Sequence, residues 1–323
     1  MTYIDINTDY QMIEELLHKI NFLEEGEKIL NVTTPGEGNM NVVLRVRTDK
    51  RTFIAKQSRP FVQKYKDIPA PAARIAVEYH FYKAVASEAV KGHIPKVLGY
   101  HQEEYLLLLE DLGDCQDLSV LYKDGQVDAS LVKTLVRVLS SIHKSAVAED
   151  YPENRELREL NHQHIFVLPF SADNGFSLDS VQEGLEALAT PYKSDAGLKK
   201  AIAAVGDRYL AKGTVVLHGD YYLGSWMTRE EEVFVIDPEF SFKGFAEFDL
   251  GVMTAHLMIA TGNKLIISQV KKAYQNSIDE KLYHQVTGIE IMRRLLGLAQ
   301  LPLVRTLEEK DEMLKIARGL VMD

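Results

Sequence analysis

Short runs of alternating apolar and polar residues fill the first third of the chain and predict a small β-sheet. The expected strands cover residues 29–32, 41–48, 52–57, 96–101 and 105–109. Apolar residues at helical spacing predict helices over residues 9–19 and 72–89. We therefore expect a five-stranded antiparallel sheet with one or two helices in this part of the chain.

From about residue 117 onward, apolar positions recur at helical spacing and predict a mainly helical region. The expected helices cover residues 131–143, 178–189, 196–211, 248–260, 265–276, 280–298 and 307–321. The polar stretch 150–174 gives no clear pattern. The predicted fold class is α+β, with a sheet-based N-terminal lobe over residues 1–111 and a helical C-terminal lobe over residues 112–323. Since single cores stop growing beyond roughly 250–300 residues, two lobes suit this length.

Two acidic sites interrupt the helical region, each at the end of a short apolar run. Asp220 follows residues 215–217 in the sequence His218-Gly219-Asp220, and Asp237-Pro238-Glu239 follows residues 233–236. A hairpin through Trp226 and Met227 would bring the two sites together. In an extended segment, Asp237 and Glu239 would point to one side. Two such carboxylates suit Mg²⁺, and Ser225 offers a further oxygen.

These residues match the parts that phosphoryl transfer needs, namely a carboxylate beside a hydroxyl acceptor and carboxylates around a divalent metal. The alternative is that Asp220 caps a helix and that Asp237 and Glu239 are solvated acids in a turn. The strand context of both sites favours the first interpretation.

Three further features of the N-terminal region suggest a nucleotide site. The turn-rich loop with Gly38 and Asn39 joins two strands, so its backbone N–H groups can approach phosphates. Lys56 lies among apolar neighbours in a strand and needs a partner, for which Glu78 is the obvious candidate. Alternatively, Lys56 is an edge-strand lysine and Glu78 faces solvent.

The apolar run 106–109 ends at Glu110 and continues through Leu112, where backbone groups could bind an adenine edge. The acids in this segment could instead cap the following helix.

Composition narrows the classes of partner. A net charge of −10 argues against nucleic acid and anionic membranes as the main partners. No apolar run approaches the roughly 20 residues of a membrane span. One cysteine, with no signal-peptide pattern at the start, predicts a reducing, cytoplasmic location. The sequence leaves the oligomeric state open, a homodimer included.

The order of these features resembles the aminoglycoside phosphotransferase and choline kinase branch of the protein-kinase-like fold. The methylthioribose kinases within this branch are similar in having Gly-Ser at Ser225, in the segment 237–251 and in a late arginine pair, Arg293 and Arg294. The resemblance implies a kinase that uses ATP and Mg²⁺ and phosphorylates a hydroxyl of a small molecule, most closely a sugar such as 5-methylthioribose.

The resemblance also implies roles for single residues. Asp220 would be the catalytic base, and Asp237 the main Mg²⁺ ligand with Glu239 as the second. Lys56 would hold phosphates, and Arg293 and Arg294 would reach the substrate or the transferred phosphoryl group. Adjacent arginines point about 100° apart on a helix, so at most one needs to face a pocket directly.

The chain departs from the methylthioribose kinases near the expected acceptor. Tyr221-Tyr222-Leu223, with Tyr222 as a candidate substrate contact, replaces their usual Leu-His-Thr, and the chain is shorter. Choline, an aminoglycoside, homoserine or a ketosamine therefore remain alternative acceptors. Two further alternatives are a catalytically inactive nucleotide-binding module and a metal hydrolase that uses His218 with the acidic residues.

Overall fold

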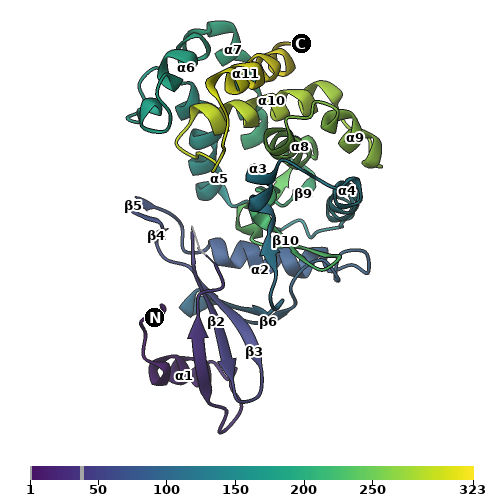
Figure 1. Cartoon of the computed structure of the whole chain (residues 1–323). Coiled ribbons are helices and arrows are strands. Elements are labelled where there is room, and N and C mark those ends of the chain that lie inside the picture. The colour runs from purple at the N-terminus through teal and green to yellow at the C-terminus, as the bar shows by residue number, and fades with distance from the viewer. Residues whose placement is uncertain (1, 37–39) are drawn as a thin grey trace.

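The N-terminal part of the molecule is built on the expected five-stranded antiparallel sheet (Figure 1). The computed structural model describes residues 2–36 and 40–323. The strand order is β1-β2-β3-β7-β6. The strands are β1 (Ile29–Thr33), β2 (Val42–Thr48), β3 (Thr52–Gln57), β6 (Val97–His101) and β7 (Leu106–Glu110). The expected sheet is therefore confirmed.

Strand β7 is buried on both faces and divides its side chains between two hydrophobic cores. Leu106 and Leu108 belong to the smaller core, which α1 (Tyr10–Lys19) covers with Ile13 and Leu17. Leu107 and Leu109 belong to the larger core together with α2 (Arg74–Val85). Since alternate side chains of a strand point to opposite faces, β7 joins the sheet to the rest of the molecule.

The C-terminal part is mainly helical, and α8 lies at its centre. Fourteen of the residues of α8, from Glu247 to Ala260, are buried. Its main partner is α10, which also packs against α11 (Figure 1). The helices are α3 (Leu121–Asp124), α4 (Ala129–His143), α5 (Arg155–His162), α6 (Leu185–Ser194), α7 (Ala196–Leu210), α8 (Glu247–Thr261), α9 (Ile266–Ala273), α10 (Glu280–Leu296) and α11 (Leu307–Met322). None of the described helices is long and apolar enough to cross a membrane.

One expected helix was placed wrongly. The prediction over residues 178–189 is replaced by a single 3₁₀ turn at Leu178–Ser180 and by α6, which begins at Leu185. The Asp179 carboxylate accepts the Glu186 N–H at 2.9 Å and so caps the later helix start. The stretch 150–174 contains α5, followed by a π-helical turn at Gln163–Val167.

Short β segments carry the two acidic sites. β9 (Val215–Leu217) pairs with β12 (Phe242–Gly244), and β10 (Trp226–Arg229) pairs with both β11 (Glu232–Val235) and β8 (Gln116–Asp117). A further hairpin, β4 (Phe61–Val62) with β5 (Tyr65–Pro69), was not expected from the sequence. The proposed lobe boundary at residues 111 and 112 lies between β7 and β8.

Helices α10 and α11 are in close contact at Gly288. A Cβ atom there would lie 2.4 Å from the Ala317 carbonyl oxygen, which is too short for a non-bonded contact. Gly319 in α11 has open space instead, since its nearest neighbour would be 4.0 Å away. The two positions therefore make a matched pair for testing the packing.

We expect Gly288→Ala to destabilise the fold by about 1–3 kcal/mol, because the backbone of α11 must move to admit the methyl group. Gly319→Ala should raise stability by about 0.5–1 kcal/mol, since alanine loses less entropy in a helix. Denaturant unfolding of both variants measures the difference. Equal stability of the two would contradict the described packing of α10 on α11.

Candidate active site

Lys56 is the charged centre of the junction between the sheet and the helical part. Its Nζ lies 2.6 Å from Glu78 Oε2 of α2 and 2.7 Å from Asp237 Oδ1, which follows β11. The expected pairing of Lys56 with Glu78 is present, and both side chains are buried. Burial lowers the pKa of Lys56, but Asp237, Glu78 and Glu239 outweigh it and raise this pKa above its usual value. Lys56 is therefore a cation held among three carboxylates.

The segment Asp237-Pro238-Glu239 is not extended, so this expectation was wrong. Asp237 has φ +61°, and Pro238–Phe240 forms a 3₁₀ turn, a position that suits proline as the first residue. The two carboxylates consequently have different surroundings. The Asp237 side chain is 48% exposed, whereas that of Glu239 is 7% exposed and is held through Oε2 by Arg74 Nε at 3.2 Å and Asn41 Nδ2 at 3.0 Å.

The loop over residues 218–225, the candidate catalytic loop, is organised by Asp249, a buried residue of α8. Its carboxylate accepts the backbone N–H groups of His218 at 2.7 Å and Gly219 at 3.0 Å, and it also contacts His143 Nε2 at 3.1 Å. Gly219 has φ +86°, and a Cβ atom there would lie 2.2 Å from the Phe240 carbonyl oxygen. Only glycine fits this turn without strain, so the loop that presents Asp220 has one available shape.

His218 holds the loop, and both of its ring nitrogens are engaged in hydrogen bonds, so neither is available to bind a metal. Its Nε2–H donates to the Ile236 carbonyl at 2.9 Å, and its Nδ1 accepts the Asp220 N–H at 3.3 Å. Ser225 Oγ donates to the Asp220 carbonyl at 2.8 Å and closes the loop from the other side.

The metal hydrolase alternative requires a group of several metal-binding side chains. Within residues 2–36 and 40–323, no group of three or more His, Cys, Asp and Glu side chains is arranged to hold a metal ion.

Asp220 faces the arginine pair of α10. Arg294 Nη2 lies 3.9 Å from Asp220 Oδ1, and the Asp220 side chain retains 26% of its exposure. Burial raises the pKa of Asp220 to about 6, although Arg294 and Arg293 lower it. This carboxylate is therefore ionised at neutral pH but is a stronger base than a solvated aspartate.

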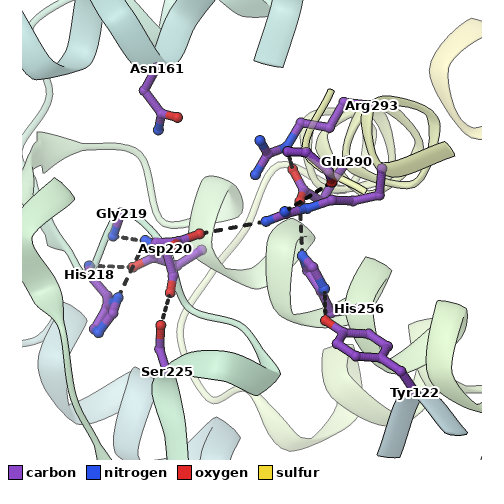
Figure 2. Close-up of polar contacts among 12 residues, drawn as sticks. Tyr122, Asn161, His218, Gly219, Asp220, Ser225, His256, Glu290 and Arg293 are labelled. Carbon is purple, nitrogen blue, oxygen red and sulfur yellow. Dashed lines mark hydrogen bonds and ion pairs between the residues drawn. The ribbon is translucent and has the colours of Figure 1, made fainter. Parts of the chain in front are cut away.

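Glu290 brings both arginines to the same site, and Figure 2 shows its contact with Arg293. One turn before them on α10, its carboxylate accepts Arg294 Nε at 2.8 Å through Oε1 and Arg293 Nε through Oε2. Both arginines can thus converge although they are adjacent in sequence. Because each Nε is taken by Glu290 and Arg294 Nη1 donates to the Ala299 carbonyl at 3.4 Å, the Arg293 Nη groups and Arg294 Nη2 are the parts left for a substrate.

A buried chain of hydrogen bonds through His256 and Tyr122 holds the Glu290 carboxylate (Figure 2). His256 Nε2 contacts Glu290 Oε1 at 2.9 Å, and the Tyr122 hydroxyl contacts His256 Nδ1. Burial lowers the pKa of His256 to about 4, so the ring is neutral and donates through Nε2. Burial also raises the pKa of Glu290, but Arg293 and Arg294 lower it well below its usual value. The carboxylate stays ionised and keeps both arginines in place.

Tyr222 lies against this cluster. The Arg294 guanidinium carbon is 5.3 Å from the centre of the Tyr222 ring, and the His256 ring is 4.9 Å away on centroids. From α5, Asn161 points toward the space between Asp220 and Arg293, and its Nδ2 donates to the Tyr209 hydroxyl at 3.2 Å (Figure 2). The side chains around Asp220 therefore include both charged and neutral hydrogen-bonding groups.

Two adjoining cavities meet at Lys56. The first, of about 200 Å³, is lined by the sheet and by residues 109–113. The second, of about 110 Å³, contains Asp220, Ser225 and Tyr222. Both are lined by Val43, Lys56, Gly224 and Asp237. A ligand in the first cavity would therefore extend past Lys56 and Asp237 toward Asp220.

The segment after β7 is held more firmly than the sequence suggested. Glu110 and Leu112 line the first cavity, as expected, but the Glu110 N–H donates to the Lys96 carbonyl at 2.9 Å. The Leu112 carbonyl accepts Arg229 Nη1 at 2.7 Å. Arg45 of β2 donates to Asp111 and to the Gly113 carbonyl at 3.1 and 2.6 Å. The predicted glycine-loop residues Gly38 and Asn39 lie outside the described residues.

The sequence analysis missed the buried and half-buried polar residues that support the site. These are Asn41, Arg45, Arg74, Tyr122, Asn161, Asp249, His256 and Glu290. Asp249 and Glu290 had a detectable signal, because each is an acid within an otherwise apolar helical run. Fully buried acids are rare unless they are paired, so such positions point to an internal partner.

Comparisons with known proteins agree with this geometry. Residues 31–283, more than half of the chain, match the phosphotransferase enzyme family. The chain belongs to this family. It is similar to a methylthioribose kinase from Exiguobacterium sibiricum, with 30% identity over 70% of this chain and 60% of that enzyme. A methylthioribose kinase from a Geobacillus species is 25% identical over 88% of this chain and 82% of that enzyme. The chain thus spans less than two thirds of the first of these relatives.

Two solved structures share the fold of this phosphotransferase family member. A choline/ethanolamine kinase family protein from Mesorhizobium loti has a TM-score of 0.54 and 16% identity, covering 96% of this chain and 95% of its own. A spectinomycin phosphotransferase in complex with ADP and spectinomycin has a TM-score of 0.54 and 13% identity, covering 98% of each chain. The expected two-lobed, protein-kinase-like α+β fold is therefore confirmed.

We expect Glu290→Gln to lower kcat about tenfold to a hundredfold, because a charge-assisted hydrogen bond to each arginine is lost. The KM for ATP should change little, since Glu290 lines neither of the two cavities that meet at Lys56. Steady-state kinetics below the unfolding temperature of the variant measure both. Glu312→Gln, an equal charge change at an exposed position of α11, is the control. A folded Glu290→Gln variant with the kcat of the unaltered enzyme would refute this role.

Proposed function

We propose that this protein is an ATP-dependent small-molecule kinase whose acceptor is a hydroxyl of a neutral sugar, with 5-methylthioribose as the leading candidate. The observation that carries the proposal is the pair of cavities that share Lys56 and Asp237 and end at Asp220. Such an arrangement can hold a nucleotide, its phosphates and an acceptor in one line, as phosphoryl transfer requires.

The nucleotide would occupy the first cavity with its phosphates at Lys56. A buried lysine needs anionic partners, and phosphate oxygens can replace Asp237 in this role. Glu78, on the other side of the ammonium group, would keep Lys56 in position during the exchange. The adenine of the nucleotide would lie against residues 109–113, where Arg45 and Arg229 fix the backbone.

The residues around Asp237 fit Mg²⁺, which favours one or two carboxylates together with phosphate oxygens and water. Asp237 is half-exposed to the second cavity, and Ser225 adds a hydroxyl oxygen. Glu239 would bind through Oε1, because Oε2 already forms an ion pair with Arg74 and accepts a hydrogen bond from Asn41 Nδ2. When bound, the metal would neutralise phosphate charge during transfer.

Asp220 would orient the acceptor hydroxyl and take its proton. Its carboxylate is fixed by the closed catalytic loop and has a pKa of about 6, which suits a base near neutral pH. The Nη groups of Arg293 and Arg294 would stabilise charge on the transferred group or orient the acceptor. Because the transition state is loose, positioning and charge neutralisation supply most of the rate enhancement.

Charge around Asp220 supports a neutral acceptor over a cationic one. Two arginines stand beside this carboxylate, and their two positive charges are balanced by Glu290 and by Asp220 itself. A cationic acceptor such as choline or an aminoglycoside would therefore meet no excess negative charge here, and it would compete with Arg294 for the Asp220 carboxylate. The similarity to methylthioribose kinases also supports a neutral sugar as the acceptor, although Tyr222 stands where those enzymes have histidine.

The inactive-module alternative finds less support. Such a module has no need for Asp220 in a fixed loop beside an arginine pair, in addition to the Lys56, Glu78 and Asp237 cluster. A protein that only binds nucleotide would require the cluster of Lys56, Glu78 and Asp237 but not the Asp220 loop. The experiments below separate the two functions.

We predict that methylthioribose stimulates ADP release from MgATP, and that choline at the same concentration does not. Asp220→Asn should lower the stimulated rate by about 10²–10⁴-fold while MgATP still binds, since it removes the base but keeps the shape. A coupled ADP assay and calorimetry measure the two quantities. Turnover by Asp220→Asn at the rate of the unaltered protein would refute the assignment of the base. MgATP binding without stimulation by any acceptor would favour the inactive module.

We also predict that Asp237→Ala abolishes the Mg²⁺ dependence of nucleotide binding, because the half-exposed carboxylate is the main protein ligand. Calorimetric titration with ATP, with and without Mg²⁺, provides the measurement. Asp150→Ala, an exposed aspartate outside the site, is the control. Unchanged Mg²⁺-dependent binding in Asp237→Ala would exclude this residue as the metal ligand.

A further inference from the structure

A basic hollow lies between α4 and α9, away from the two cavities described above. The two helices pack side by side in the C-terminal part (Figure 1). The hollow has a volume of about 670 Å³. Its lining includes four cationic side chains and no acidic one; the cations are Lys133, Arg137, Lys144 and Lys272.

The placement of these cations follows from helix geometry. Lys133, Arg137 and Lys144 are four and seven residues apart on α4 and at its C-cap, so they share one face. Lys272 projects from α9 on the opposite side of the hollow. Among the residues that the structure describes, none of the three lysines forms an ion pair, and Arg137 contacts only the His93 ring, at 3.2 Å, through its side chain.

A concentration of positive charge is unusual on a protein with a net charge of −10. The hollow also contains neutral hydrogen-bonding groups, Ser140, Ser141, Gln269 and Gln275. Ser140 is 5% exposed, and its hydroxyl has no hydrogen-bond partner within the described part of the chain. Because the Ser140 oxygen is itself buried, the four cations, which have no acidic partner among the described residues, are what suit this surface to an anionic ligand.

We propose that this hollow binds a small anion that carries two or more phosphate charges. Lysine and arginine side chains on two helices can surround such a group and donate charge-assisted hydrogen bonds from both sides. The volume suits a ligand of nucleotide size. A long polyanion fits less well, because outside the hollow it would meet a surface with excess negative charge.

The opposite side of α4 contacts the catalytic loop. The Leu135 carbonyl accepts the Tyr221 hydroxyl at 2.8 Å, and His143 contacts Asp249, which holds the loop backbone. Arg137 is linked through His93 to the Val233 carbonyl of β11, the strand that leads to Asp237. The anion would therefore bind to the helix that supports the catalytic loop. This site does not depend on the proposed kinase activity.

Calorimetric titration of the full chain with inorganic pyrophosphate, in buffer with EDTA to remove Mg²⁺, tests the proposal. We expect binding to the unaltered protein and equally to Lys56→Ala, because the nucleotide site is not involved. Lys133→Gln combined with Lys272→Gln, one change on each helix, should weaken binding about tenfold or more. The matched control is Lys200→Gln with Lys212→Gln, two exposed lysines elsewhere, and it should bind normally.

Amide hydrogen exchange locates the site independently, with protection by pyrophosphate expected over residues 129–144 and 266–273. Absence of binding would overturn the proposal. So would loss of binding in Lys56→Ala with retention in the Lys133/Lys272 variant, which would assign pyrophosphate to the nucleotide site. Equal weakening in both lysine pairs would also overturn it, because net charge alone would then account for binding.

Discussion

The buried ammonium group of Lys56 connects the parts of this molecule on which its chemistry depends. It lies on β3, and its two carboxylate partners come from α2 and from the end of β11. Removing one partner of a buried ion pair costs about 3–5 kcal/mol, so the sheet, α2 and the Asp237 turn are constrained together. Phosphates that enter this junction would meet a cation already in place and would release Asp237 for the metal.

Two further buried carboxylates organise the surroundings of Asp220, and each acts on a different kind of group. Asp249 fixes backbone N–H groups and so determines the shape of the loop that carries Asp220. Glu290 fixes guanidinium groups and so determines where the arginine charges lie. Neither needs to touch a substrate. Because these two buried residues do the positioning, only Asp220 and the two arginines need to face a substrate.

The sequence was sufficient to predict the sheet, most of the helices, and the convergence of Lys56, Glu78, Asp220 and Asp237. The sheet and the helices follow from local periodicity, which is a property of neighbouring residues. The convergence of the four site residues follows from motif order and from the family resemblance. The Asp237–Glu239 geometry failed because the period-two argument assumes an extended chain, whereas Pro238 begins a 3₁₀ turn. Arg74 and Asn41 could not be assigned to Glu239, since contacts so distant in sequence leave no local pattern.

The structure of the protein with Mg²⁺ and a non-hydrolysable ATP analogue would test the central claim most directly. We predict that Lys56 leaves Asp237 for the phosphates while it keeps its contact with Glu78, and that Asp237 coordinates the metal. The adenine should lie against residues 109–113, with the terminal phosphate directed toward Asp220. A nucleotide bound elsewhere, or a Lys56–Asp237 ion pair that persists with nucleotide in the cavity, would contradict the account.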